Sequence, residues 1–251
     1  MFLNCHSTYS LRYGTIPVEE LVTEAAKQKL DYLALTDINC TTGVFDFVKS
    51  CKDAGIKAIV GVEFRKDEQL CFIGLAKNLD GFRELNELLT KTNLGEMPFP
   101  YRSPYFSNVF VIYPSSNIPD ILQPHEFIGI RPEEAKRYKN PLLKRLDKLV
   151  CLHPITHRSK EEYELHKLLR CIDHNILLSN LKDEQSANAH EYFVPKERIE
   201  KAFENTPNIL RNTQLLADQC EFELSIKEQK NKRCFTSNIY EDKVLLESLA
   251  L

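Results

Sequence analysis

The stretch LALTDINCTTGVFDFVKSCKDAGIKAIVGVE, residues 33–63, decides the fold of this chain. One apolar run, residues 31–36, leads into it, and a second apolar run, residues 57–62, closes it. Between these runs, residues 43–54 carry apolar side chains at helical spacing and are followed by a glycine, a common helix stop. The pattern predicts a strand–helix–strand unit of a parallel sheet.

An acidic residue follows each of these predicted strands, Asp37 the first and Glu63 the second. Residues 2–6 form a short apolar run whose alternation places Asn4 and His6 on one face, and His6 ends the run. Because ligands bind at the C-terminal ends of parallel strands in α/β proteins, these residues are candidates for a site. One imidazole and two carboxylates suit a divalent ion with a metal-activated water. Asp and Glu are also common at strand ends as helix caps and loop anchors, and that alternative stays open.

Two further histidines, His153 and His157, flank a Pro-Ile-Thr turn, either as additional ligands or as caps of the helix that follows. Other catalytic signatures are missing from the sequence, which has no G-x-G, no G-x-x-x-x-G-K and no G-x-S-x-G. No two aspartates are two positions apart, so the paired carboxylates that hold metals in many polymerase active sites are missing too. The chain by itself is not expected to polymerise nucleotides.

The composition bounds the class of protein. With 251 residues, of which 43% are hydrophobic, the chain is long enough for one α/β barrel. A net charge of −3 gives no electrostatic argument for strong independent nucleic-acid binding, which needs a basic face. No apolar run approaches the roughly 18–20 residues that span a membrane, and the N-terminus is not a signal peptide. The eight cysteines form no C-x-x-C pair, which indicates reduced, mostly buried thiols of a cytosolic protein.

Outside the central stretch, apolar runs alternate with amphipathic segments, which favours a parallel α/β fold. Six of the twelve prolines fall between residues 96 and 124, where we expect loops around one strand. Ser159 and Glu162 have the spacing of a capping box. Residues 225–237 suit a surface linker, and the helix after them is cut off without a C-cap, which suggests a longer protein. Further strands are expected at residues 69–76, 108–113, 127–130 and 149–152, and further helices from residue 17 and at residues 81–94, 132–138, 159–173, 195–205, 208–219 and 242–251.

Four stretches resemble, in the right order, the polymerase and histidinol phosphatase (PHP) domain at the N-terminus of bacterial DNA polymerase III alpha subunits. They are residues 2–64, 71–90, 159–173 and 194–224. The resemblance implies a fold of the α/β class, a distorted seven-stranded (β/α) PHP barrel with a C-terminal helical extension. The implied domains are a PHP barrel at residues 1–190, the helical extension at residues 191–224, and a linker with the start of the segment leading to the polymerase palm at residues 225–251.

Active members of this family bind a cluster of divalent metal ions at the barrel mouth and hydrolyse phosphoesters. Set against their ligand motifs, this sequence keeps three remnant metal ligands: His6, Asp37 and Glu63. A metal cluster needs several donors to overcome the repulsion between its ions. The resemblance therefore implies no catalytic residues, and at most one weakly held Zn, Mn or Fe ion as cofactor. The other ligand positions fall on Asn4, Ile38, Cys71, Tyr113 or Pro114, and Pro154-Ile155-Thr156 unless His153 or His157 substitutes by a shift in register.

If no metal ion is bound at the predicted barrel mouth, the buried carboxylates there must be stabilised in another way. Buried carboxylates need hydrogen-bond donors in place of the ion. We expect Asn4, Thr36 and Arg131 to be the donors to these carboxylates.

The resemblance implies a part of a replicative DNA-directed DNA polymerase, a nucleotidyltransferase of DNA replication in the cytoplasm. The domain, inactive by itself and with a degenerate metal site, is expected to brace the rest of the polymerase chain and to help dock a proofreading exonuclease subunit. It would meet DNA through the full-length polymerase, and no membrane is involved. The alternative is an active metal-dependent phosphoesterase or 3′–5′ proofreading exonuclease that uses the three remnant ligands with help from His153 or Cys71. A free-standing phosphatase of the histidinol-phosphate type is disfavoured by the C-terminal helical segment and the cut-off end.

Overall fold

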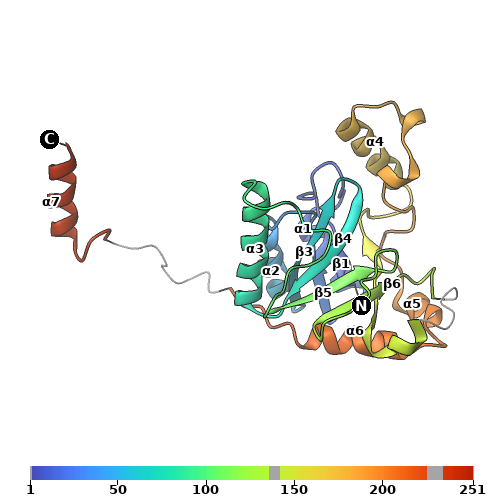
Figure 1. Cartoon of the computed structure of the whole chain (residues 1–251). Coiled ribbons are helices and arrows are strands. Elements are labelled where there is room, and N and C mark those ends of the chain that lie inside the picture. Colours follow the sequence, from blue (N-terminus) through green and yellow to red (C-terminus); the bar gives the residue numbers. More distant parts are fainter. Residues whose placement is uncertain (1, 136–141, 225–233, 251) are drawn as a thin grey trace.

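The computed structural model describes residues 2–135, 142–224 and 234–250 (Figure 1). The chain has a mixed α/β fold built on one curled six-stranded sheet with the strand order β2-β3-β4-β5-β6-β7. β1 and β8 form a separate parallel pair. The predicted count of seven barrel strands is not confirmed in the part of the chain that the structure describes. The strands are β1 (Asn4–Cys5), β2 (Tyr32–Leu35), β3 (Lys57–Lys66), β4 (Gln69–Ala76), β5 (Val109–Pro114), β6 (Glu126–Ile130), β7 (Leu149–Cys151) and β8 (Pro154–Ile155).

The strand–helix–strand unit predicted around residues 33–63 is confirmed. β2 and β3 are parallel neighbours, and α2 (Val44–Ala54) connects them. Gly55 follows this helix at a φ of 70°, a left-handed conformation that glycine adopts at little cost. β3 is longer than predicted, however, because it continues through Glu63 to Lys66. Glu63 therefore lies inside the strand rather than after it.

The expected parallel alternation fails at the hairpin formed by β3 and β4. These strands are antiparallel, and β4 also pairs antiparallel with β5. The turn between β3 and β4 contains Asp67 at a φ of 52° and is too short for the crossover helix that a parallel pair needs. The register of the hairpin shifts by one residue after Phe64, which leaves Cys71 as an extra residue on β4. The pairs β5–β6 and β6–β7 are parallel, as predicted.

The β1–β8 pair links the two ends of the curled sheet. β1 is hydrogen-bonded to β2 on one side, where Thr36 N donates to Cys5 O at 2.9 Å and Ala34 N donates to Phe2 O at 3.2 Å. On the other side, β8 follows β7 in the chain after two residues. The strands therefore enclose one interior, and the chain just after β1 reaches the same rim as β2 and β3.

The helices cover the outside of the sheet and one of its ends. α1, α2 and α3 pack outside the strands, while α6 runs beneath them, at the opposite end from α4 (Figure 1). Leu216 and Ala217 of α6 belong to the same apolar cluster as Ile59, Ile73 and Val150 of the strands, so α6 closes the lower end of the interior. The helices are α1 (Val18–Lys27), α2, α3 (Leu79–Asn93), α4 (Tyr163–His174), α5 (Lys196–Ala202), α6 (Asn208–Asp218) and α7 (Ile239–Ala250), with short 3₁₀ helices η1 (Leu142–Lys148), η2 (Leu178–Asn180) and η3 (Asp183–Gln185).

Several local predictions can be compared with these elements. The capping box predicted at Ser159 and Glu162 is wrong. α4 begins four residues after Ser159 and has no side-chain cap. The Glu162 carboxylate accepts a hydrogen bond from Arg158 N at 3.2 Å instead. Residues 132–135 of a predicted helix form turns, and the rest of that helix lies outside the described residues, as do residues 225–233 of the predicted linker. None of the eight cysteines, all of which are described, is in a disulfide, and six of them are buried, as expected.

Candidate functional site

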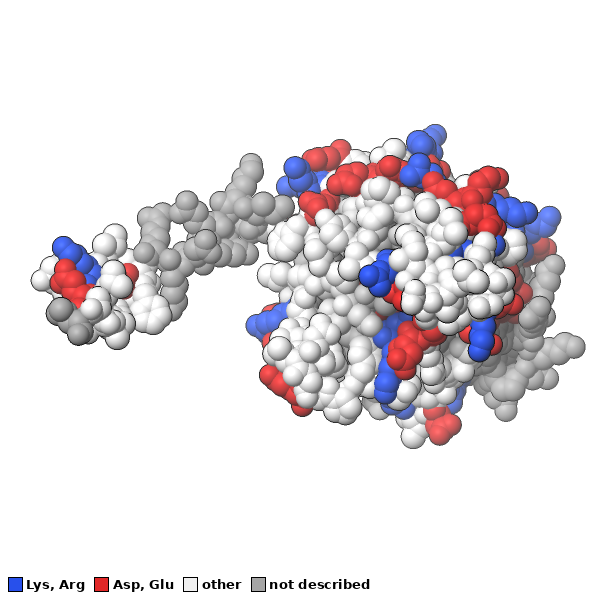
Figure 2. Space-filling view, turned by 90° about the horizontal axis from the view of Figure 1, so that it is seen from above, with Lys and Arg blue, Asp and Glu red and all other residues white. Residues whose placement is uncertain are grey.

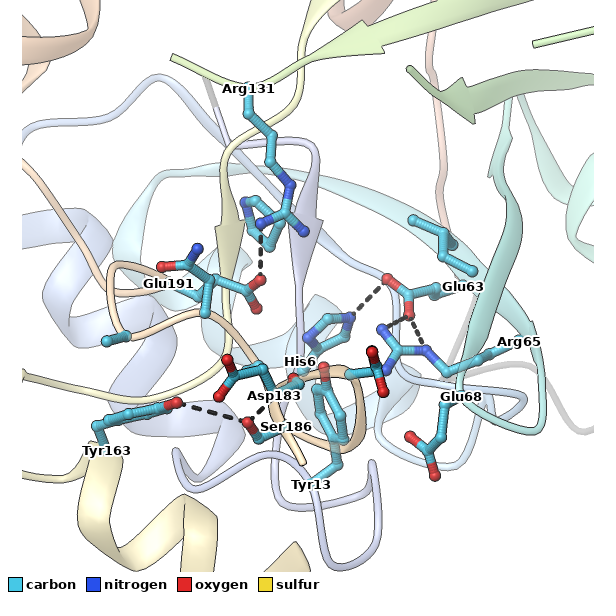
Figure 3. Close-up of a pocket in the computed structure, with 16 residues that line it drawn as sticks. His6, Tyr13, Glu63, Arg65, Glu68, Arg131, Tyr163, Asp183, Ser186 and Glu191 are labelled. Carbon is cyan, nitrogen blue, oxygen red and sulfur yellow. Dashed lines mark hydrogen bonds and ion pairs between the residues drawn. The ribbon is translucent and has the colours of Figure 1, made fainter. Parts of the chain in front are cut away.

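A pocket of ≈ 490 Å³ lies at the rim where several strands deliver polar side chains (Figure 3). His6 directly follows β1, Glu63 and Arg65 belong to β3, and Arg131 directly follows β6. Glu191 reaches the pocket from the segment before α5. Parallel strands that end at one rim thus bring together residues that lie far apart in the sequence.

The carboxylate of Glu63 is fully buried and accepts hydrogen bonds at both oxygens. Oε2 accepts from Asn4 Nδ2 at 2.9 Å and from His6 Nε2 at 3.0 Å. Oε1 accepts from Arg65 Nε at 2.8 Å and also from Nη2 of the same guanidinium. Burial by itself would raise the pKa of Glu63, but the charge of Arg65 and the contacts of His6 and Asn4 hold that pKa well below its ordinary value. Glu63 is therefore an ionised carboxylate whose charge is already balanced.

Arg65 lies between Glu63 and the ring of Tyr13 (Figure 3). Its guanidinium carbon is 4.5 Å from the ring centroid, and its side chain is only 12% exposed. Burial would lower the pKa of Arg65, but the Glu63 carboxylate raises it above its ordinary value, so the charge persists. Burial raises the pKa of Tyr13 to about 12, so the ring under the guanidinium is neutral and offers it a cation–π contact.

A second buried carboxylate, Glu191, is connected to the first through His6. His6 Nδ1 lies 3.0 Å from Thr156 Oγ1, and that hydroxyl donates to Glu191 Oε2 at 2.7 Å. Arg131 Nη1 donates to Glu191 Oε1 at 3.0 Å. Burial would raise the pKa of Glu191, but the charge of Arg131 and the Thr156 hydroxyl lower it. Both ring nitrogens of His6 are therefore engaged, and each buried carboxylate has an arginine of its own.

Asp37 is also buried, but its carboxylate accepts hydrogen bonds from a different set of donors. It is not among the residues that line the pocket. Its Oδ1 accepts from Ser7 N and from Ser10 Oγ, each at 2.7 Å, and its Oδ2 accepts from Ser7 Oγ at 2.8 Å. Asp37 thus ties the loop after β1 to the end of β2. Thr36, expected as a donor to the carboxylates, donates to Asn4 Oδ1 at 2.6 Å instead. The structure brings His6 and Glu63 together and holds Asp37 apart in its own network.

The residues at this mouth do not fit the metal cluster that the family implies. Within residues 2–135, 142–224 and 234–250, no group of three or more His, Cys, Asp and Glu side chains is arranged to hold a metal ion. Protein donors already occupy both oxygens of Glu63 and both oxygens of Asp37. Both ring nitrogens of His6 also have protein hydrogen-bond partners, Thr156 Oγ1 and Glu63 Oε2. An ion that bound Glu63 would have to displace the guanidinium of Arg65.

Two histidines predicted as possible helpers have other partners. His153 Nε2 lies 2.9 Å from Tyr192 O, and burial lowers the pKa of His153, so the ring is neutral. His157 Nδ1 lies 2.7 Å from Ser159 O. Both rings therefore hold backbone segments in place and are not among the residues that line the pocket.

Cys71 and Tyr113, two other positions of the family's ligands, pack away from the mouth. Both belong to the apolar cluster that contains Phe64. Because Phe64 alternates with Glu63 on β3, this cluster lies on the other face of the sheet from the Glu63 carboxylate. Tyr113 donates its hydroxyl to a separate buried carboxylate, Glu126, at 3.0 Å.

Several residues of the networks were missed from the sequence: Arg65, Tyr13, Ser7, Ser10 and Glu191. The signal for Arg65 was present, because side chains two positions apart on a strand share a face and Arg65 follows Glu63 by two. Arg131 was expected to bind one of the predicted ligands, and that expectation is wrong, since it pairs with Glu191. No local pattern marks Glu191, because a loop positions it.

α4 lies over the rim with its polar side inward. His166 Nδ1 donates to Tyr13 O at 2.7 Å and its Nε2 accepts from Ala187 N at 2.8 Å. Arg170 forms ion pairs with Glu68 and Asp173, each at 2.7 Å. The outward side of α4 and of the turn after it carries large apolar residues, each at least 45% exposed, and we call them the α4 apolar face: Leu165, Leu168, Ile172, Leu177 and Leu178.

Figure 2 views the molecule from above, the side on which α4 lies in Figure 1. Lys and Arg are interspersed with Asp and Glu around broad uncharged areas on this side. The described residues that face the viewer thus form no extended basic surface of the kind that binds nucleic acid independently.

Comparisons with known proteins find a matching family and several relatives. Residues 3–116 match the family model "PHP domain". The chain is 25% identical over 270 aligned positions to DNA polymerase III subunit alpha of Halalkalibacterium halodurans, which covers 94% of this chain and 24% of that protein. It is 26% identical over 275 positions to the error-prone DNA polymerase of Symbiobacterium thermophilum, covering 87% of this chain and 25% of that protein. A solved structure from Bifidobacterium adolescentis, named as a metal-dependent phosphoesterase, is 14% identical over 80% of this chain and 94% of that chain, with a TM-score of 0.32 that carries no argument.

Residues 3–116 are therefore a PHP domain. Over most of its length the chain is homologous to a part of DNA polymerase III alpha subunits, and it spans about a quarter of the length of the curated relatives named above. Among the helices that the structure describes, none is both long enough and apolar enough to cross a membrane.

Proposed function

We propose that this chain is the N-terminal PHP domain of a DNA polymerase III alpha subunit and has no phosphoesterase activity of its own. In this role it is a structural domain that braces the remainder of a DNA-directed DNA polymerase, in the cytoplasm, and meets DNA only through that polymerase. The homology to polymerase alpha subunits supports the parentage. The three remnant ligands, His6, Asp37 and Glu63, are then inherited positions that now serve structure.

One observation carries the inactive role: the polar groups of these three residues are hydrogen-bonded to other protein groups rather than left open toward a common point. A hydrolytic metal site needs an open coordination position for water or substrate. Here the position next to Glu63 is taken by the guanidinium of Arg65, which is a permanent cation but neither binds nor activates a water as a metal does.

The test is the metal content and the hydrolytic rate of the unchelated protein. We expect well under one equivalent of Zn, Mn or Fe by mass spectrometry, and hydrolysis of p-nitrophenyl phosphate and of single-stranded DNA no faster with added Mn²⁺ than without protein. His6→Ala should leave both results unchanged. Two or more bound ions, with hydrolysis that His6→Ala abolishes, would contradict the proposal and favour an active phosphoesterase or 3′–5′ exonuclease.

We also propose that the chain helps to dock a proofreading exonuclease subunit, and the α4 apolar face supports this docking role. In α4, His166 and Arg170 are buried, whereas Leu165, Leu168 and Ile172 are exposed to solvent. Such exposed apolar groups gain free energy when a partner covers them. The mixed charges on the same side favour a protein partner over a nucleic acid. The direct check is the affinity of this chain for the exonuclease subunit, and no measurable binding would remove this half of the proposal.

A further inference from the structure

The charges at the barrel mouth are balanced in two pairs. Glu63 and Glu191 are buried carboxylates, and Arg65 and Arg131 contact one each. Arg131 is 34% exposed at its side chain, whereas Arg65 is 12% exposed and is enclosed by Glu63 and Tyr13. Arg65 is therefore the more deeply placed cation of the mouth.

A divalent ion and this guanidinium compete for the same oxygens. A metal ion binds a carboxylate oxygen at about 2.0–2.2 Å, closer than any hydrogen-bond donor can approach. Arg65 Nε already lies 2.8 Å from Glu63 Oε1, and Nη2 contacts that oxygen too. Two cations at these positions would repel each other strongly, because the side chains of Glu63 and Arg65 are almost entirely buried.

We propose that the Arg65 guanidinium is the resident cation of this mouth and that it keeps divalent ions away from Glu63 and His6. This inference rests on the proposed function in one respect, namely that the native domain holds no metal. Without the positive charge of Arg65, the Glu63 carboxylate and His6 Nε2, which lie 3.0 Å apart, become a two-ligand site for a hard divalent ion. Arg65 is a positioning residue in this account and takes part in no reaction.

The experiment compares the native chain with Arg65→Met, which keeps the length of the side chain and removes the charge, and with Arg65→Lys, which keeps the charge. The matched control is Arg102→Met, because Arg102 pairs with another buried carboxylate, Glu126, outside the mouth. Melting temperature is measured in EDTA and in Mn²⁺, an ion that prefers carboxylate oxygen to thiol ligands and therefore avoids the buried thiols.

We expect Mn²⁺ to raise the melting temperature of Arg65→Met by about 2–4 °C or more, and to leave the native chain, Arg65→Lys and Arg102→Met unchanged. The rise should disappear in the double variant that also carries Glu63→Gln. If Arg65→Met does not fold in EDTA, the same comparison is made by refolding it in Mn²⁺: recovery of the fold supports the inference, and failure to recover overturns it.

Three results would overturn the inference while leaving the proposed function standing: no response of Arg65→Met to Mn²⁺, an equal response of Arg65→Lys, or a response that survives Glu63→Gln. An equivalent or more of metal in the native chain is a different outcome, because it contradicts the proposed function as well.

Discussion

Glu63 and Arg65 lie two residues apart on β3 and form a buried ion pair, with Arg65 Nε 2.8 Å from Glu63 Oε1. A regular strand places residues i and i+2 on the same face, so the backbone of β3 alone brings these two side chains together. The pair connects Asn4 and His6 on one side to Tyr13 on the other. It is therefore the centre of the network at the mouth.

Glu63→Gln should be strongly destabilising. The change keeps the shape of the side chain but leaves the guanidinium of Arg65 buried without a counter-charge, and breaking a buried pair in this way costs about 3–5 kcal/mol. The measurement is urea unfolding at neutral pH. Glu164→Gln, which breaks an exposed pair with Lys167, is the control and should cost less than about 1 kcal/mol. Equal losses of unfolding free energy in the two variants would show that the buried ion pair contributes no more to stability than the exposed pair.

Asp37→Ala should lower stability and leave hydrolysis where it was. The change removes the acceptor of the Ser7 amide and of the Ser7 and Ser10 hydroxyls, and each buried donor left without a partner costs about 1–3 kcal/mol. Thermal unfolding measures the first effect and phosphoester hydrolysis the second. A large loss of hydrolytic rate together with unchanged stability would mean that Asp37 is a working ligand.

His166 should make the domain less stable in mild acid. Burial lowers the pKa of His166 from an ordinary 6.5 to about 4, and its Nε2 must stay unprotonated to accept from Ala187 N. Between these two pH values the unfolded chain binds a proton that the folded chain excludes. The free energy of unfolding therefore falls as the pH drops from 6.5 to 4, by up to about 3 kcal/mol.

The His166→Gln variant isolates this effect, because it cannot take up the proton. Its unfolding free energy should vary less with pH in this window than that of the native chain, as measured by urea unfolding at several pH values. His190→Gln, a change at an exposed histidine, serves as the control and should follow the native profile. A profile of His166→Gln parallel to the native one would contradict the assignment.

Leu216→Ala tests whether the packing of α6 against the strands stabilises the fold. Leu216 is 1% exposed and packs with strand residues in the interior, so its truncation should cost about 2–5 kcal/mol. Leu215, its neighbour, is 49% exposed, and Leu215→Ala should change the unfolding free energy little. A small effect of Leu216→Ala would mean that α6 packs only loosely against the strands.

The α4 apolar face gives a prediction about docking. Leu168→Asp and Ile172→Asp change residues that are 50% and 64% exposed, so the melting temperature should change little. Affinity for the exonuclease subunit should fall at least tenfold, because a charge would enter the buried centre of the interface. Leu94→Asp, at an exposed leucine after α3, is the control. Unchanged affinity in the α4 variants would place the docking surface elsewhere.

Much of the fold follows from local patterns. The periodicity of residues 43–54 and the glycine after them predict α2 with its correct end, and the prolines between residues 96 and 124 leave room for β5 alone. The antiparallel hairpin was not foreseen, because an apolar run such as β4 has no direction until its neighbour is known. Cys71 shows the same limit, since a one-residue register shift decides where its side chain packs.

The sequence by itself determined which residues could be ligands, His6, Asp37 and Glu63, and that most of the family's other donors are missing from it. The spacing of Glu63 and Arg65 is also in the sequence, and residues two apart on a strand share a face, but the structure was needed to show that they pair. Only the tertiary structure decided that Asp37 accepts hydrogen bonds from Ser7 and Ser10 and that Arg131 forms an ion pair with Glu191. Hydrogen bonds and ion pairs act over a few ångströms, so the partner of a buried charge depends on which distant segments the curled sheet brings within that reach.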